Sequence, residues 1–402
     1  MDPVRNPYAP GAGSPPPELA GRSDVLTAGT TALQRVALGR ATQSLILVGL
    51  RGVGKTVLLN RLNEAADEHK FKSAFIEAHE GKRLPELIAP SLRTILFSLS
   101  TIENSKELAR RGLRGLKGFL SGLNLSVGGD EGLSLGVDAE AGLADSGSIE
   151  ADLPELILAI AEAAKAAGKP VAIFLDELQY LEEREFSALI MAVHRVNQRS
   201  LPLILVGAGL PQIRGLAGNS KSYAERLFRY PEIGALSHDD AVAAIVRPAA
   251  DEGVSFSDEA VERVIADTEK YPYFLQQWGY EAWNAAESEH IDLDVIVRAS
   301  VEAVRELDQR FFRVRLDRCT PSEKRYMRAL AEMGRGKHRS GDVADKLGLK
   351  VTSAAPTRSA LIRKGMIYSP AHGDTAFTVP LFDTYMRREM PVLPGAAEEE
   401  AE

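Results

Sequence analysis

The sequence predicts an α/β fold: a parallel β-sheet with helices on both faces, followed by an all-helical domain and a small domain of three helices and a hairpin. Apolar strands alternate with segments of helical spacing over residues 44–206, and two of these strands are continuous apolar runs. Such alternation is typical of parallel sheets, whose strands are buried on both faces. After residue 237 the spacing becomes purely helical, which predicts a separate domain.

Composition places the chain among ordinary globular proteins. Its 402 residues suit two or three domains, and 45% of them are hydrophobic and 26% charged. The single cysteine, Cys319, excludes an internal disulfide framework and fits a reducing compartment. The N-terminus is Pro-rich, not basic and then apolar, and no apolar stretch reaches membrane-spanning length. We therefore expect a cytoplasmic protein without a membrane span.

The order of elements divides the first half of the chain. Residues 1–18, with three consecutive prolines, predict a flexible or extended arm, and a helical stretch to Leu38 follows. Residues 19–236 are expected to form the sheet domain. Its strands are predicted at 44–48, 72–77, 171–176 and 202–206, and its helices at 55–67, 84–101, 153–167 and 184–198.

One segment fits the phosphate-binding pattern G-x-x-x-x-G-K-[ST]: Gly49-Leu50-Arg51-Gly52-Val53-Gly54-Lys55-Thr56. An apolar strand precedes it and a helix starting near Val57 follows, so backbone N–H groups and the helix dipole surround one anion. Lys55 would contact the terminal phosphates, and the Thr56 hydroxyl would ligate Mg²⁺. Residues 49–57 are thus predicted to bind a nucleoside triphosphate with Mg²⁺, as in a P-loop NTPase.

A second strand, residues 171–176, ends in two adjacent carboxylates, Asp176 and Glu177. Ligands of open α/β sheets bind at the carboxyl ends of strands, where Asp176 can hold Mg²⁺. Glu177 would then polarise the attacking water. The alternative is a solvated strand end, which the upstream phosphate loop makes less favoured.

Residues 103–150 interrupt the alternation and contain ten of the 34 glycines. Apolar residues alternate with polar ones on both sides of a turn at residues 128–132, which predicts a hairpin. Before it lies a basic amphipathic helix with glycines at positions 112, 115 and 118. We interpret this insertion as packed on its own domain, with a partner-binding or membrane-surface element as the alternative.

The second half is predicted to contain a lid and a winged helix. Residues 237–316 carry four helical segments: 238–251, 257–268, 273–286 and 292–316. Within residues 317–390, three helices and a short hairpin make a winged helix. Residues 391–402 are an acidic tail. The net charge is −8, yet residues 319–390 carry 13 Lys/Arg against 7 Asp/Glu, so this end is the candidate for polyanion contact.

The order of these features resembles the AAA+ and STAND ATPases, in the bacterial and archaeal branch near the origin-initiator ATPases. The similarity covers residues 19–390, nearly the whole chain. The resemblance implies ATP as the nucleotide and hydrolysis of ATP to ADP and phosphate, with Lys55 and Glu177 as catalytic residues. In that family a Gly-Arg segment lines the adenine pocket, and Gly21 and Arg22 match it.

The resemblance points to three further positions. Related ATPases place a polar residue, sensor 1, after the strand 202–206, where this chain has Gly207 and Ala208, so we expect slow turnover. Arg226 lies where they place an arginine finger that reaches a neighbour's γ-phosphate, which implies a homo-oligomer. A surface arginine beside Glu225 is the alternative. Pro272 matches a lid segment that contacts the base, but no second sensor arginine is evident.

Two functions follow from these patterns. In the first, ATP binding or slow hydrolysis repositions a winged helix that binds duplex DNA through Thr352, Ser353, Thr357, Arg358, Arg363 and Lys364. In the second, the chain is a signalling or scaffolding ATPase whose winged helix docks protein partners, with turnover that can be negligible. Binding to duplex DNA that depends on salt would separate the two.

Overall fold

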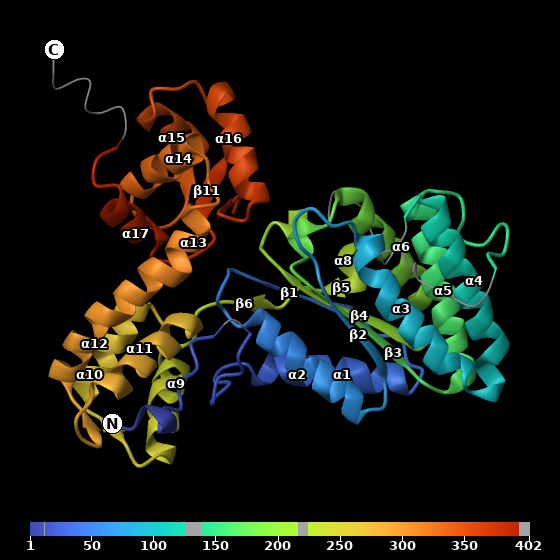
Figure 1. Ribbon diagram of the computed structural model, residues 1–402, viewed down its shortest axis with the longest axis horizontal. Helices are drawn as coiled ribbons and strands as arrows, with labels where there is room; N and C mark the ends of the chain where they lie inside the picture. Colours follow the sequence, from blue (N-terminus) through green and yellow to red (C-terminus); the bar gives the residue numbers. More distant parts are fainter. Residues whose placement is uncertain (12, 126–137, 216–223, 394–402) are drawn as a thin grey trace.

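A computed structural model of the chain describes residues 1–11, 13–125, 138–215 and 224–393 (Figure 1). Over its described residues the sheet domain has six strands: β1 (Ser44–Gly49), β2 (Lys72–Glu77), β3 (Val171–Asp176), β4 (Leu203–Gly209), β5 (Phe228–Arg229) and β6 (Glu232–Ile233). Their order is β2-β3-β4-β1-β5, with β6 also paired to β1, and every pair is parallel. The predicted parallel sheet is confirmed.

Helices cover both faces of this sheet. On one face lie α1 (Ser23–Ala37) and α2 (Lys55–Glu68), and on the other lie α3 (Leu84–Ser100), α5 (Ile149–Ala167) and α6 (Glu183–Gln198) (Figure 1). Because side chains of a strand alternate, Leu45 and Leu47 belong to the first hydrophobic cluster and Ile46 and Val48 to the second. The short helix α8 (Ala224–Leu227) precedes β5.

The glycine-rich insertion packs on its own domain. Its helix α4 (Lys106–Gly122) lies against α3 and α5, and a Cβ on Gly112 would come within 2.5 Å of the Leu96 side chain. The glycines therefore let α4 approach its neighbours closely. Its basic face is paired with Glu140, which lies 2.9 Å from Arg114 and 3.5 Å from Arg111. The predicted hairpin falls largely on residues 126–137, outside the described residues.

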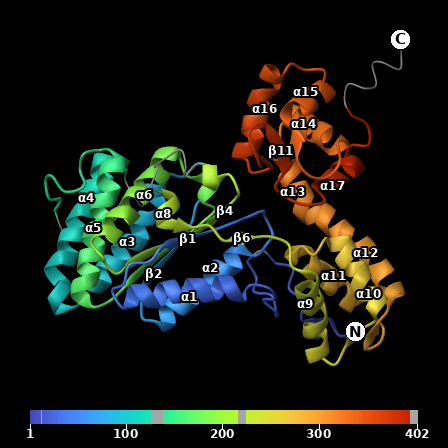
Figure 2. The ribbon, with the colours of Figure 1, turned by 180° about the vertical axis from the view of Figure 1, so that it is seen from behind.

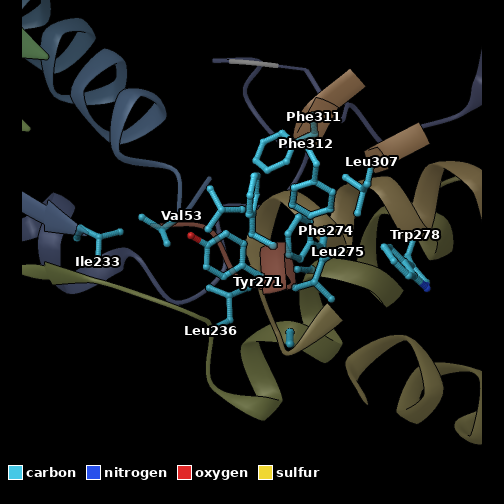
Figure 3. Packing of buried hydrophobic residues seen from close by; sticks show 14 of the residues in the cluster. Val53, Ile233, Leu236, Tyr271, Phe274, Leu275, Trp278, Leu307, Phe311 and Phe312 are labelled. Carbon is cyan, nitrogen blue, oxygen red and sulfur yellow. The ribbon is translucent and has the colours of Figure 1, made fainter. Parts of the chain in front are cut away.

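The predicted helical lid follows the sheet domain. It consists of α9 (His238–Asp251), α10 (Asp258–Thr268), α11 (Pro272–Ala285) and α12 (Leu293–Glu306), with the short strands β7 (Ser255–Phe256) and β8 (His290–Ile291). A π-helical turn (Leu307–Phe312) and α13 (Arg313–Leu316) continue α12 toward the C-terminal domain. Aromatic residues of α11 and of this turn pack together beside Val53 of the sheet domain (Figure 3).

The C-terminal domain is a winged helix. Its helices are α14 (Pro321–Glu332), α15 (Ser340–Lys346) and α16 (Val351–Arg363), and its antiparallel sheet is made of β9 (His338–Arg339), β10 (Ile367–Tyr368) and β11 (Asp374–Phe377). A fourth helix, α17 (Phe382–Glu389), packs on α14. Figure 2 shows that the lid and the winged helix both lie at one end of the sheet domain. No helix among the described residues has the length and apolar character that a bilayer crossing requires.

The N-terminal residues correct the expectation of a flexible arm. A 3₁₀ turn (Pro3–Arg5) begins a segment that packs along the lid. The Tyr8 side chain is buried, and its hydroxyl donates a hydrogen bond to the Ile245 carbonyl. Trp283 Nε1 donates to the Asp2 carbonyl at 2.9 Å. A proline-rich composition does not reveal such anchoring, because one buried aromatic and a few backbone hydrogen bonds are enough to dock the segment.

Candidate nucleotide-binding site

A cavity of about 510 Å³ lies where the carboxyl ends of the central strands meet the lid. The loop between β1 and α2 forms its floor, and Glu177 at the end of β3 forms part of its wall. Lid residues from α11 and from the π-turn region close the opposite side. The structure thus brings the two motifs predicted from sequence to one cavity, at the edge of the sheet where α/β folds bind ligands.

The phosphate loop has the backbone expected of an anion site. Gly54 caps α2 with φ of 91°, and Gly52 has φ of 83°, so both occupy the left-handed region that other residues rarely adopt. Lys55 is buried and donates from Nζ to the Leu50 carbonyl at 2.8 Å. Burial lowers the pKa of Lys55 to about 8, against the opposing attraction of Glu177 and Asp176. A buried cation of this kind is stabilised when an anion enters the loop.

Oxygen ligands suited to Mg²⁺ lie beside the loop. The Thr56 hydroxyl donates to Asp176 Oδ2 at 2.6 Å, so the two predicted ligands are in contact. Burial raises the pKa of the Asp176 carboxyl, and the hydrogen bond from Thr56 opposes that shift. A divalent cation would stabilise the charged form of this buried carboxylate, and Mg²⁺ commonly takes one such carboxylate plus phosphate oxygens. Thr56 and Asp176 therefore fit Mg²⁺.

Glu177 lines the cavity from a strained backbone position. Its φ of 54° is left-handed, which is uncommon for a residue with a side chain. Such outliers concentrate at functional sites, where the surrounding structure maintains them. Arg51 Nη1 lies 3.6 Å from Glu177 Oε1. The Glu177 carboxylate thus lies at the wall of the cavity, beside Arg51 of the phosphate loop.

Arg51, inside the phosphate loop, is contacted by all three domains. Its guanidinium donates to the Tyr180 hydroxyl at 2.8 Å in the sheet domain. The Tyr271 hydroxyl of the lid donates to its carbonyl. Its backbone N–H donates to the Thr378 carbonyl of the winged helix at 3.2 Å. A Cβ on Gly365, just after α16, would lie 2.7 Å from Arg51 Nη2, so the winged helix rests directly on this side chain.

Arg315 of α13 also lines the cavity and was not predicted from the sequence. Its guanidinium lies over the Phe311 ring, with Cζ 3.9 Å from the ring centroid. Burial first, and then the nearby positive charge of Arg51, lower the pKa of Arg315 to about 10, so it stays charged at neutral pH. Among the described residues, no carboxylate lies within 4.0 Å of it. Its Nη1 donates a hydrogen bond to the Phe311 carbonyl, so the half-buried guanidinium has a backbone partner but no anionic one, and it is suited to an anionic ligand.

Part of the cavity lining is apolar. Leu19, Ala20, Leu236 and Pro272 form it, and the docked N-terminal segment contributes residues such as Ala9. Arg22 lines the cavity as well and donates to the Gly234 carbonyl at 2.6 Å. Gly21 is not among the lining residues, because it turns toward Asp240 with φ of 66°. Apolar walls in a cavity that contains a phosphate loop suit the base of a nucleotide.

Two predicted positions lie elsewhere. Arg226 is exposed on α8, and its carbonyl accepts a hydrogen bond from Gln43. Gln43 directly precedes β1, so this contact lies at the amino end of the strand, whereas the phosphate loop follows its carboxyl end. It does not line the cavity of its own chain. Its role as an arginine finger in trans stays a prediction. The end of β4 carries Gly207, Ala208 and Gly209, with no polar side chain of its own.

The winged-helix residues are separate from the cavity. Thr352, Ser353 and Arg363 are exposed along α16, and Thr357 is half-buried. Two other predicted DNA contacts are occupied within the protein. Arg358 donates to Thr375 Oγ1 at 2.8 Å and to the Asp374 carbonyl at 2.7 Å, which ties α16 to the wing.

Lys364 is the second of these occupied residues. It donates to Glu323 at 2.7 Å and to the Arg318 carbonyl at 2.9 Å. A side chain held by such partners within the protein is not free to contact phosphates. We therefore remove Arg358 and Lys364 from the proposed contact set.

Comparison with known proteins gives two family matches. Residues 18–206 match the model of the AAA ATPase domain, and residues 309–386 match a domain of unknown function (DUF8462). No curated protein matches the chain.

Three solved structures can be aligned over most of the chain. The Walker-type ATPase PABY2304 of Pyrococcus abyssi shares 16% identity with a TM-score of 0.55, over 92% of this chain and 96% of that chain. The Orc1 protein of Aeropyrum pernix, in complex with DNA, shares 17% identity with a TM-score of 0.47, over 96% of this chain and 96% of that chain. The RuvB Holliday junction branch migration motor of Thermotoga maritima shares 15% identity with a TM-score of 0.44, over 91% of this chain and 96% of that chain. The first supports the fold, and no argument rests on the other two.

Proposed function

We propose that this protein is an ATP-controlled switch, in which the bound nucleotide sets the position of the winged helix. The match of residues 18–206 to the model of the AAA ATPase domain supports the proposal. Phosphates would lie on the backbone N–H groups of the loop and on Lys55, with the base against the apolar lining of the cavity. Mg²⁺ held by Thr56 and Asp176 would neutralise charge on the phosphate oxygens. Different residues would thus bind the phosphates, the base and Mg²⁺.

Glu177 supplies the general base for slow hydrolysis in this proposal. A water oxygen attacks the γ-phosphorus while the bond to the β–γ bridging oxygen breaks, and that oxygen leaves with its electron pair as part of ADP. The water proton passes to the Glu177 carboxylate. Arg315, without a carboxylate partner among the described residues, would contact the γ-phosphate from the lid.

The observation that carries the switch is the junction at Arg51. The backbone N–H of Arg51 donates a hydrogen bond to the Thr378 carbonyl of the winged helix, and the Arg51 guanidinium packs against Gly365. Any movement of Arg51 therefore changes the surface on which the winged helix rests. Core and lid partners, Tyr180 and Tyr271, fix the other sides of the same residue.

ATP and ADP differ at this junction by one phosphate. A ligand shifts a conformational equilibrium only through its different affinity for the two states. The γ-phosphate adds negative charge close to Arg51 and Arg315. A hydrogen bond from a guanidinium to a charged phosphate is stronger than the bond that Arg51 donates to the uncharged Tyr180 hydroxyl. We expect the guanidinium of Arg51 to turn toward ATP and to weaken the docking of Gly365.

The winged helix has two candidate ligands, duplex DNA and a protein partner. Thr352, Ser353 and Arg363 are exposed on α16 and suit phosphate contacts of duplex DNA. Leu349 and Val351, at the start of the same helix, are 43% and 51% exposed, which favours the second candidate, a protein partner. The internal engagement of Arg358 and Lys364 reduces the basic surface and also favours it.

The test measures the affinity of the full chain for a fluorescent DNA duplex with ADP and with a non-hydrolysable ATP analogue. At about 50 and about 200 mM salt, we expect binding that depends on salt and differs between the nucleotides. Arg363→Ala should weaken binding and flatten the log–log salt dependence by about one unit. Arg298→Ala, an exposed lid arginine, is the matched control. Absence of duplex binding at the lower salt would favour the protein-docking function.

A further inference from the structure

The end of β4 lacks a polar side chain for a physical reason. A Cβ on Gly207 would lie 2.5 Å from the Leu178 side chain. One on Gly209 would lie 2.8 Å from Gln179 Oε1 and 2.0 Å from Ile213. The two glycines leave room for the 3₁₀ turn after the acid pair, Leu178–Tyr180, which packs against the strand end. The space that a polar β4 residue would fill is taken by Gln179.

The partners of Gln179 fix the orientation of its amide. The Leu210 backbone N–H, at the end of β4, donates to Gln179 Oε1 at 3.1 Å. A backbone N–H can only donate, so the oxygen of the amide must face Leu210 and its nitrogen must face the other way. That nitrogen donates to Glu177 Oε2. One side chain therefore connects the sheet framework to the carboxylate of the general base.

We infer that Gln179 is a positioning residue for Glu177, which supplies from the turn after the acid pair the polar contact that the end of β4 lacks. The inference rests on the proposed hydrolysis, in which Glu177 accepts the proton of water. Gln179 does not touch the nucleotide in this account. It acts by holding the carboxylate.

The Glu177 carboxylate has a competing partner, which is why it needs to be held. Arg51 Nη1 lies 3.6 Å from Glu177 Oε1, so a modest rotation would turn this contact into a close ion pair. The neutral amide of Gln179 holds Glu177 from the opposite side without adding charge. Removing Gln179 would release Glu177 toward Arg51.

Two substitutions separate the contacts of Gln179. Gln179→Met keeps the length of the side chain and removes both hydrogen bonds. Gln179→Glu can still accept from the Leu210 N–H, but it places a second carboxylate against Glu177. Gln198→Glu is the control, because Gln198 is exposed at the end of α6. Each variant is assayed as the full chain for steady-state ATP turnover, pH dependence and thermal unfolding.

We expect Gln179→Met to lower kcat at least about tenfold while KM changes less than about threefold, since positioning affects the proton transfer and not ATP binding. Gln179→Glu should lower kcat as well. It should also move the acid limb of the kcat–pH profile to higher pH, because two carboxylates in contact share a proton. Gln198→Glu should match the wild type in kcat and KM.

Three outcomes would overturn the inference. Wild-type kcat in Gln179→Met would show that Glu177 needs no such support. A fall in kcat that comes with an equal rise in KM and a lower unfolding temperature, with an unchanged acid limb in Gln179→Glu, would assign Gln179 to structure alone. No turnover in the wild type would remove the proposed hydrolysis, and the inference with it. The first two outcomes leave the proposed hydrolysis intact.

Discussion

Lys55→Ala is expected to abolish ATP binding, the largest effect of any single substitution in this chain. The phosphates would lose their main positive charge in a buried site, where charge-assisted contacts are strongest. Binding of a fluorescent ATP analogue with Mg²⁺ measures the loss. Lys82→Ala, an exposed lysine outside the cavity, is the matched control and should bind as the wild type does.

The same charge can be tested in the wild type through pH. Burial lowers the pKa of Lys55 to about 8, and a bound phosphate favours the protonated form. Below pH 8 the lysine already carries its proton, so affinity should be nearly constant. As the pH rises through 8, binding requires uptake of a proton, and affinity should fall toward about tenfold per pH unit. Tight ATP binding by Lys55→Ala, or affinity that is flat from neutral pH to well above 8, would contradict the assignment of the phosphate loop.

Glu177→Gln is expected to keep ATP bound and to lower kcat by about a hundredfold or more, the scale of losing a general base. The amide preserves the shape of the side chain but cannot accept the proton of the attacking water. Single-turnover hydrolysis with a nucleotide-binding assay in parallel separates the chemical step from affinity. Glu183→Gln, at the exposed start of α6, is the control and should hydrolyse ATP at the wild-type rate.

Hydrolysis by Glu177→Gln at the wild-type rate would remove Glu177 from the mechanism. A wild type without turnover would favour the alternative in which ATP binding alone operates the switch.

Short contiguous patterns made the sheet and the floor of the cavity predictable. The loop at residues 49–56 encodes backbone geometry and charge together, and the acid pair follows directly on its buried strand. The parallel sheet could be predicted because its central strands are continuous apolar runs. The helices of the lid could be predicted because helical periodicity is a local pattern of the sequence, which can be recognised without knowing the tertiary contacts.

Residues that meet only in three dimensions were not predictable. Arg315 reaches the cavity because a π-helical turn at residues 307–312 and the packing of Phe311 orient α13, and no local pattern marks that geometry. Gln179 was missed because its role depends on Leu210, on a different element. The contact between Gly365 and Arg51 joins residues more than 300 positions apart in the sequence.

Charge patterns overstated the exposed basic surface. Arg358 and Lys364 lie on or beside the predicted recognition helix, yet each forms hydrogen bonds within the protein. The basic face of α4 likewise pairs with Glu140 of its own insertion. Sequence shows the presence of a charge but not its partner, so only a structure distinguishes a free cation from a paired one.

The most direct test of the switch is the distance between the sheet domain and the winged helix in each nucleotide state. Spin labels on Glu64→Cys of α2 and Asp345→Cys of α15, both exposed, can be placed in a Cys319→Ser background and measured by pulsed electron resonance. The switch predicts a distance distribution with the non-hydrolysable ATP analogue that differs from the one with ADP. Identical distributions without nucleotide, with ADP and with the ATP analogue, at saturating concentrations, would contradict it.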